Sequence, residues 1–177
     1  TSFSGGYATG KQGDNVYMID KKGTKTTLDC KNTIGISEGL IGIQNEDDIW
    51  GVIDINLNVI TDFNYVDLYP FKNGYAQFKE FYDMGLLNAR GESVLPTEYT
   101  YVHPMSENRI FVQPSETSAI LMDENFKVLK EFPNFYKSFG NEFIFRDGLA
   151  LVYLIVGPQK GSSNESIRLN GGFAATY

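Results

Sequence analysis

Residues 49–60, IWGVIDINLNVI, contain two short β-branched runs separated by a polar turn, and this pattern recurs along the chain. Val52-Ile53 ends the first run and Val59-Ile60 ends the second, which favours a pair of antiparallel strands. The acidic or amide residue that closes the first strand recurs in steps of 34, 34 and 35 residues, at Asp20, Asp54, Asn88 and Asp123. A constant period in this range is typical of solenoids, propellers and other repeat arrays.

A second motif, in which a short turn precedes an apolar strand, keeps nearly the same period. It reads FSGGYA at 3–8, ISEGLI at 36–41, FKNGYA at 71–76, MSENRI at 105–110 and FRDGLA at 145–150. Glycine recurs in it, at Gly5, Gly39, Gly74 and Gly148, and glycine permits tight turns and bulges because it has no Cβ. One such unit cannot bury its own apolar face, so neighbouring units are expected to stack.

The sequence therefore predicts an all-β fold, a tandem repeat array of antiparallel three-stranded units of about 34 residues, stacked like a solenoid. An open or partial β-propeller is the alternative, although three strands are fewer than the four of a propeller blade. The array is expected to cover residues 1–156, and residues 157–177 are expected to be a polar linker with a possible capping strand. The predicted units lie near 3–35, 36–70, 71–104, 105–144 and, in part, 145–156.

The four periodic Asx residues, Asp20, Asp54, Asn88 and Asp123, are predicted to be structural turn residues, because Asx side chains bond nearby backbone amides. Gly23 and Gly91 can adopt a positive φ in their turns. Leu57 and Phe126 occupy the matching position in the other two copies, which predicts a different turn type there. Two other interpretations are a row of cation sites and a catalytic carboxylate pair, which needs a separation of about 5–9.5 Å across a bond.

WGVID at 50–54, followed by VI, a tyrosine and FKNGYAQF at 71–78, resembles the WG-repeat family, also described as KWG repeats. The resemblance covers roughly residues 3–152 and is closest over 71–102. It implies an interaction module that accompanies other domains, and a bacterial protein that is secreted or lies in the cell envelope. Because Val16, Met84 and Ala119 replace the tryptophan, and Tyr17 and Ile120 replace the glycine, a packing role is favoured for the motif.

Composition excludes several classes of function. The formal net charge of −7 and the pI near 4.7 argue against a nucleic-acid-binding surface and against an anionic membrane surface. No run of about 18 apolar residues is present to span a membrane. Since the chain begins at Thr1 rather than methionine, we expect a processed or excised chain, and a cytoplasmic location stays open beside the secreted one.

Candidate reactive residues are few. Cys30 is the single cysteine and His103 the single histidine. A metal site that relies on two histidines is therefore excluded, and no Ser-His-Asp or Cys-His constellation can draw on a second histidine. Cys30 is expected to be a small hydrophobe and His103 an ordinary, partly exposed side chain. Asn45-Glu46-Asp47-Asp48 could supply oxygen ligands to Ca²⁺, but it lacks a spaced ligand pattern and is predicted to be a solvated hairpin tip. No metal and no cofactor are predicted.

Aromatic side chains are the main candidates for ligand contact, since the chain has thirteen Phe, eleven Tyr and one Trp. Most are expected to fill the core, and the tentative ligand-binding set is Trp50, Phe81, Tyr82, Tyr99 and Tyr101. The predicted function is non-catalytic recognition of a partner protein through an extended β-repeat face. A module that binds cell-surface glycan or cell wall is the alternative, and a glycoside-hydrolase-like enzyme is the second alternative.

Overall fold

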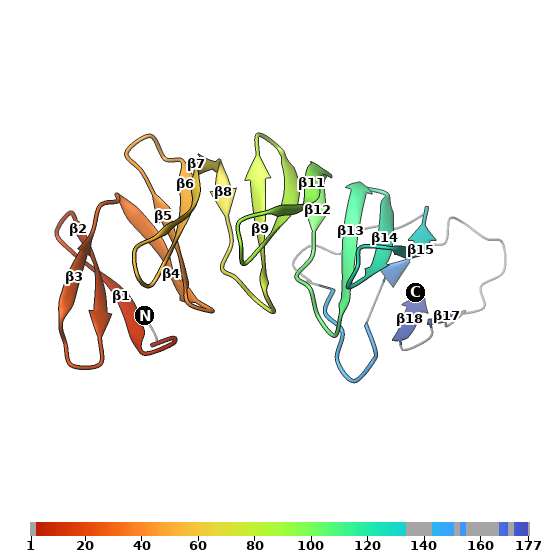
Figure 1. Cartoon of the computed structure of the whole chain (residues 1–177). Helices are drawn as coiled ribbons and strands as arrows, with labels where there is room; N and C mark the ends of the chain where they lie inside the picture. Colours follow the sequence, from red (N-terminus) through yellow and green to blue (C-terminus); the bar gives the residue numbers. More distant parts are fainter. Residues whose placement is uncertain (1–2, 134–142, 151–152, 155–166, 170–171, 177) are drawn as a thin grey trace. The chain divides into compact units, whose positions relative to one another are not determined.

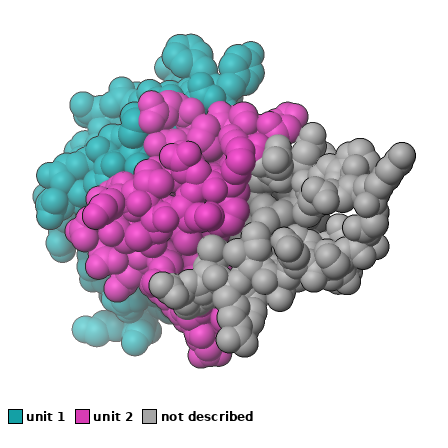
Figure 2. Space-filling model, turned by 90° about the vertical axis from the view of Figure 1, so that its right-hand side faces the viewer, with its two compact units in different colours: residues 1–97 teal, residues 98–177 magenta. Residues whose placement is uncertain are grey.

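The structure is a computed structural model that describes residues 3–133, 143–150, 153–154, 167–169 and 172–176. Within those residues the chain is entirely β-structure and turns, without a helix, as predicted (Figure 1). It divides into two compact units, residues 1–97 and 98–177, which Figure 2 colours separately. The division falls inside one strand, Ser93–Tyr99.

The first unit contains three open sheets, with strand orders β1-β2-β3, β4-β5-β6-β7 and β11-β10-β9-β8. Antiparallel pairing joins β1 to β2, β2 to β3, β4 to β5, β5 to β6, β6 to β7, β8 to β9 and β9 to β10. The strands are β1 (Tyr7–Gln12), β2 (Asn15–Asp20), β3 (Lys25–Leu28), β4 (Asn32–Ser37), β5 (Leu40–Gln44), β6 (Trp50–Asp54), β7 (Val59–Tyr65), β8 (Asp67–Leu68), β9 (Tyr75–Glu80), β10 (Asp83–Asn88) and β11 (Ser93–Tyr99).

The second unit contains the sheet β12-β13-β14-β15, which is antiparallel, and the sheet β16-β18-β17. In the latter, β16 and β18 are parallel, and β17 and β18 are antiparallel. The strands are β12 (Tyr101–Val102), β13 (Arg109–Ser115), β14 (Ser118–Asp123), β15 (Val128–Phe132), β16 (Tyr153–Leu154), β17 (Ile167–Leu169) and β18 (Gly172–Thr176). β17 and β18 lie in the segment expected to cap the array, whereas the predicted linker at 157–166 lies outside the described residues.

The number of strands differs from the expected three in three of the repeat sheets, which have four. The connecting segment explains the extra strand. β7 completes the second sheet through pairing with β6, and two residues later β8 pairs with β9 of the third sheet. One connection therefore contributes a strand to each of two successive sheets, which the alternation of its residues did not reveal.

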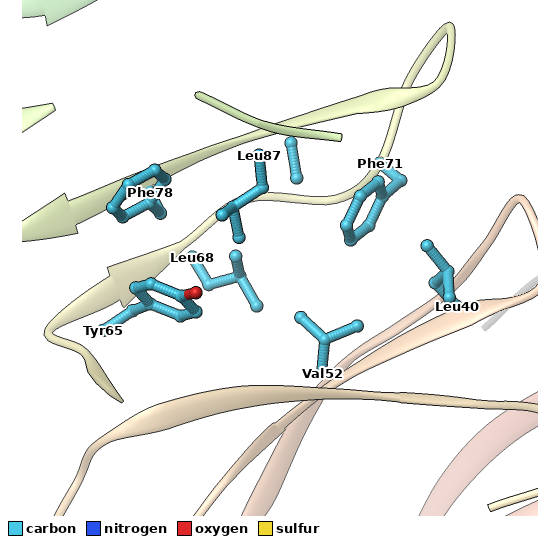
Figure 3. Packing of buried hydrophobic residues seen from close by; sticks show 8 residues of the cluster. Leu40, Val52, Tyr65, Leu68, Phe71, Phe78 and Leu87 are labelled. Atoms are coloured by element: carbon cyan, nitrogen blue, oxygen red, sulfur yellow. The ribbon is translucent and has the colours of Figure 1, made fainter. Parts of the chain in front are cut away.

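Apolar side chains are buried between successive sheets of the first unit, as expected for units that cannot bury a face alone. One cluster joins Val52 and Tyr65 of the second sheet to Phe78 and Leu87 of the third, as Figure 3 shows. A second cluster joins the first and second sheets and consists of Val16, Met18, Leu28, Ile41, Ile43 and Ile53. The second unit has its own cluster of Phe111, Ala119, Leu121, Phe132, Phe143, Phe145 and Ala150.

The four periodic Asx residues form the same turn in every repeat. In each, one side-chain oxygen accepts hydrogen bonds from the backbone N–H groups two and four residues later. The acceptor-donor sets are Asp20 with Lys22 and Thr24, Asp54 with Asn56 and Asn58, Asn88 with Arg90 and Glu92, and Asp123 with Asn125 and Lys127, all at 2.8–3.1 Å. The periodicity of these residues therefore reflects a repeated local hydrogen-bonding requirement.

The prediction of a different turn at Leu57 and Phe126 is wrong. Their φ angles are 68° and 61°, close to the 84° of Gly23 and the 78° of Gly91. The preceding Asx side chain fixes two amides of the turn, so the left-handed conformation is imposed whatever residue occupies that position. A bulky residue in this conformation is disfavoured by about 1–2 kcal/mol because its Cβ approaches the following carbonyl.

Replacing Leu57 with glycine is expected to raise the free energy of unfolding by about 0.5–1 kcal/mol, because relief of the strained φ exceeds the entropy cost of glycine. Guanidinium unfolding of the variant and the parent measures this difference. The control is Asn56→Gly in the same turn, where φ is not positive and glycine should destabilise. Equal losses in both variants would show that the turn does not strain Leu57.

Candidate functional site

The tryptophan position of the WG motif is a packing position in this chain. Val16, Met84 and Ala119, its counterparts in the other repeats, are each 1% exposed. Trp50 itself is partly buried and packs against the cluster between the second and third sheets. The first residue of the motif therefore contributes to the core in all four repeats.

The glycine of the motif is required by close approach of the neighbouring strand. A Cβ built on Gly85 would lie 2.6 Å from the Phe78 ring and 2.8 Å from the Leu95 carbonyl oxygen. At Gly51 the corresponding atom would lie 3.1 Å from the Asp62 carbonyl oxygen. The motif glycine thus acts as a spacing residue, which agrees with the packing role favoured from the sequence.

Exposure separates the five candidate ligand-binding aromatics. Phe81 and Tyr82 are 84% and 92% exposed, the largest fractions among the exposed large hydrophobic residues. Tyr99 is buried, and Tyr101 is half-buried with its ring 4.7 Å from the His103 ring. Of the five candidates, Phe81 and Tyr82 therefore offer the largest aromatic surface to a ligand, whereas Trp50 and Tyr101 are partly buried.

Phe81 and Tyr82 form the two-residue turn between β9 and β10, and we call this pair the aromatic tip. Glu80 pairs with Asp83, so the aromatic tip is the whole connection. The φ of Phe81 is 55°. For a bulky side chain a positive φ is an outlier, and such outliers gather at functional sites.

The first repeat shows what this turn needs structurally. The β1–β2 hairpin has the same length and register as β9–β10, with Gln12 paired to Asn15. Its two turn residues are Gly13, with φ 60°, and Asp14. Glycine accepts the positive φ of the first turn position, and aspartate is a polar residue suited to an exposed turn. Phenylalanine at the first position has an unfavourable φ, and neither phenylalanine nor tyrosine is buried there. Local folding therefore does not explain the aromatic tip.

The surroundings of the aromatic tip combine an apolar neighbour with acidic residues. Val66 is 50% exposed, and its N–H donates to the Lys79 carbonyl 2.9 Å away, which places it beside the end of β9. Glu80 and Asp83 flank the turn and are exposed. The Lys79 ammonium lies 3.5 Å from the Asp67 carboxylate, so the positive charge of Lys79 is already paired with Asp67. The aromatic tip thus has an apolar centre and an acidic rim.

The four Asx residues are engaged by their own turns rather than by one another. The Asp20 pKa is held below its ordinary value mainly by the hydrogen bond from the Thr24 amide, and that of Asp54 by the Asn58 side chain. These carboxylates are therefore stabilised in their charged form as turn caps. Among the described residues no group of three or more His, Cys, Asp or Glu side chains is arranged to hold a metal ion.

The acidic loop 45–48 is also an Asx-capped turn. The Asn45 side-chain oxygen accepts from the N–H groups of Asp47 and Ile49 at 3.0 and 2.9 Å. The Asp48 carboxylate pairs with Lys31 at 2.6 Å. This arrangement is the solvated hairpin tip expected from the sequence.

The lone histidine and cysteine are both parts of the packing. His103 was expected to be partly exposed, but it is fully buried, because its ring packs 4.6 Å from Phe143. Its Nδ1 accepts the Phe143 N–H at 3.1 Å. Burial, with a smaller contribution from Asp29, raises the pKa of Cys30 to about 11, so the thiol is protonated at neutral pH.

Sequence reasoning missed two glutamates. Each lies in a turn and uses its carboxylate to accept two successive backbone N–H groups from the corresponding turn of the next repeat. Glu38 accepts from Asn73 and Gly74, and Glu107 accepts from Asp147 and Gly148. The Ser-Glu pair in ISEG at 36–39 and MSEN at 105–108 is the signal that could have identified them.

A solved Saccharomyces cerevisiae structure, a Dbp5 variant bound to Nup159, a Gle1 variant, IP6 and ADP, contains a chain similar to this one at 11% identity and a TM-score of 0.49. The match covers 99% of this chain and 58% of that chain, so this chain spans less than two thirds of its length. No curated protein matches.

None of the described residues forms a helix long and apolar enough to cross a membrane. The family described as WG containing repeat matches residues 50–80 and 84–113. These are two adjacent repeats, and they include both Gly51 and Gly85, whose spacing role the structure shows. Residues 50–113 therefore contain two adjacent repeats that match the WG-repeat family.

Proposed function

We propose that this chain is a non-catalytic recognition module that binds a partner protein, and that the aromatic tip is the centre of the contact. The observation that carries the proposal is the exposure of Phe81 and Tyr82 in a turn that glycine and aspartate fill in the first repeat. Adjacent exposed aromatics are typical of the anchors that dominate binding energy at protein interfaces. The Asx carboxylates cap their own turns, so their positions do not favour a catalytic function.

The chemistry of the aromatic tip indicates what the partner offers. Phe81 and Val66 carry no polar side-chain atom, so they fit an apolar pocket rather than the hydroxyl groups of a sugar. Glu80 and Asp83 flank the tip, which favours a pocket rimmed by lysine or arginine. The partner we propose is therefore a protein with an apolar pocket and a basic rim. A secreted or cell-envelope location belongs to the same proposal.

The test first identifies the partner and then measures the contact. A photo-crosslinking amino acid at position 82, introduced in the native cell, should capture one protein that the same group at Val59 does not. Val59 is the matched control because it is 66% exposed in the same unit but lies at the Asp54 turn. The captured protein is then purified, and its dissociation constant is measured by calorimetry.

The decisive variant carries the turn of the first repeat, Phe81→Gly with Tyr82→Asp. It is expected to weaken binding of the purified partner by about 30-fold or more, because truncated anchors cost at least about 2 kcal/mol. Its free energy of unfolding should equal or exceed that of the parent, since glycine accepts the positive φ. The control Val59→Thr should leave the dissociation constant unchanged.

Three results would overturn the proposal. One is equal crosslinking at positions 82 and 59, and another is unchanged affinity in the double variant. The third concerns the glycan alternative, in which a tyrosine beside an acidic residue stacks on sugar. Sedimentation with peptidoglycan that depends on Tyr82, in the absence of any protein partner, would replace protein recognition by glycan recognition.

A further inference from the structure

Two turns of the described residues have sequences that are chemically labile, Asn73-Gly74 and Asp147-Gly148. In such pairs the backbone nitrogen of glycine can attack the side-chain carbonyl carbon of the preceding residue. The new N–C bond closes a succinimide, and ammonia leaves from asparagine or water leaves from aspartic acid. Addition of water then opens the ring to aspartate or isoaspartate. Glycine favours the reaction because no Cβ hinders its nitrogen.

Both turns have the geometry of two-residue hairpin connections. Asn73 and Gly74 have φ angles of 55° and 83°, and Asp147 and Gly148 have 53° and 74°. The flanking residues bond to each other in both cases, as Lys72 N–H does to the Tyr75 carbonyl at 2.8 Å. Positive φ at both central positions identifies a type I′ turn, for which Asn-Gly and Asp-Gly are the preferred sequences. The turn geometry therefore favours the residues that make these sites labile.

The same turns are held by glutamates of the preceding repeat. One Glu38 carboxylate oxygen accepts the Asn73 N–H at 2.7 Å, and the other accepts the Gly74 N–H at 2.8 Å. In the second unit Glu107 binds the N–H groups of Asp147 and Gly148 in the same way, both at 2.7 Å. Each glutamate thus binds the nitrogen that would be the nucleophile.

This arrangement opposes ring closure in two ways. The nitrogens of Asn73 and Gly74 are the end atoms of the ψ torsion of Asn73, and binding both to one carboxylate fixes the torsion that must rotate for attack on the side chain. Deprotonation of the Gly74 nitrogen would also exchange a charge-assisted hydrogen bond for repulsion between two anions. The argument applies unchanged to Asp147 and Gly148.

We propose that Glu38 and Glu107 protect the Asn73-Gly74 and Asp147-Gly148 turns from succinimide formation, and that Asn73 and Asp147 are the sites of spontaneous modification when that contact is lost. Conversion of Asn73 to isoaspartate would add a main-chain atom inside a two-residue turn. Conversion to aspartate would place a second carboxylate beside Glu38. The isoaspartate product weakens the contact between successive repeats, so damage at this turn promotes further opening, whereas an aspartate is compatible with the contact, as Asp147 beside Glu107 shows.

The test is incubation of the full chain at physiological pH and temperature, with peptide mapping by mass spectrometry. Glu38→Ala should raise the rate of deamidation at Asn73 by about tenfold or more, which is the factor expected for a lost hydrogen bond to a charged group. It should leave isoaspartate at position 147 unchanged. Glu107→Ala should show the reverse pattern, so each variant is the control for the other.

A further control separates protection from general loss of stability. Asn88→Ala removes the cap of a turn in the same unit and leaves Glu38 in place. Its Asn73 should deamidate at the parent rate under conditions where both variants remain folded by circular dichroism. The proposal is overturned if Asn88→Ala accelerates deamidation as much as Glu38→Ala does. Slower deamidation in Glu38→Ala would also overturn it, because Glu38 would then act as a base that assists attack.

Discussion

Replacement of Gly85 by alanine is expected to lower the free energy of unfolding by about 2–3 kcal/mol, the upper part of the range for an overpacked core site. The new Cβ would lie 2.6 Å from the Phe78 ring and 2.8 Å from the Leu95 carbonyl oxygen. Phe78 is 2% exposed and its ring centroid lies 4.7 Å from that of Tyr65, with the two rings tilted by 59°, so the Phe78 ring has little room to withdraw. The carbonyl belongs to the neighbouring strand β11, which would have to separate from β10.

Gly10→Ala is the matched control for this prediction. Gly10 lies in β1, in a strand of the same unit, and its Cβ would meet only the Ile19 Cδ1 atom at 3.4 Å. Its free energy of unfolding should stay within about 0.5 kcal/mol of the parent value. Guanidinium unfolding followed by circular dichroism gives both values. Equal effects would show that close strand approach does not explain the glycine of the WG motif.

Phe111→Ala is expected to have the largest effect in the second unit, a loss of about 3–5 kcal/mol in the free energy of unfolding. Phe111 is fully buried, and its ring centroid lies 6.0 Å from that of Phe132, 5.8 Å from that of Phe143 and 5.6 Å from that of Phe145. Truncation removes one side of three aromatic contacts and leaves a cavity that the paired strands β13 and β14 cannot close.

The same substitution at Phe81 is the control, because Phe81 is 84% exposed. Phe81→Ala should change the free energy of unfolding by no more than about 0.5 kcal/mol, as for most surface substitutions. Unfolding curves of the two variants, each compared with the parent, measure the contrast. A small loss at Phe111 would mean that the aromatic cluster is not the core of the second unit.

Individual residues show which structural features could be predicted from the sequence. The Asx turns could be predicted because donor and acceptor lie within four residues of each other, so the sequence motif contains the complete hydrogen-bonding unit. The different turn predicted at Leu57 failed because propensity was weighed above that side-chain cap. The burial of His103 was missed because its partner, the Phe143 N–H, lies 40 residues away.

By itself, the sequence determined the all-β repeat, its period and its capped turns, since these depend on contacts within one hairpin and recur with each copy. Tertiary structure alone decided which aromatics are exposed: Tyr82 lies in the turn between β9 and β10 and is 92% exposed, whereas Tyr99 lies at the end of β11 and is buried. It also decided the roles of Glu38 and Glu107, whose hydrogen bonds span 35–41 residues. Such contacts exist only once successive repeats pack together, so the Ser-Glu pairs of the sequence do not by themselves show what the glutamates bind.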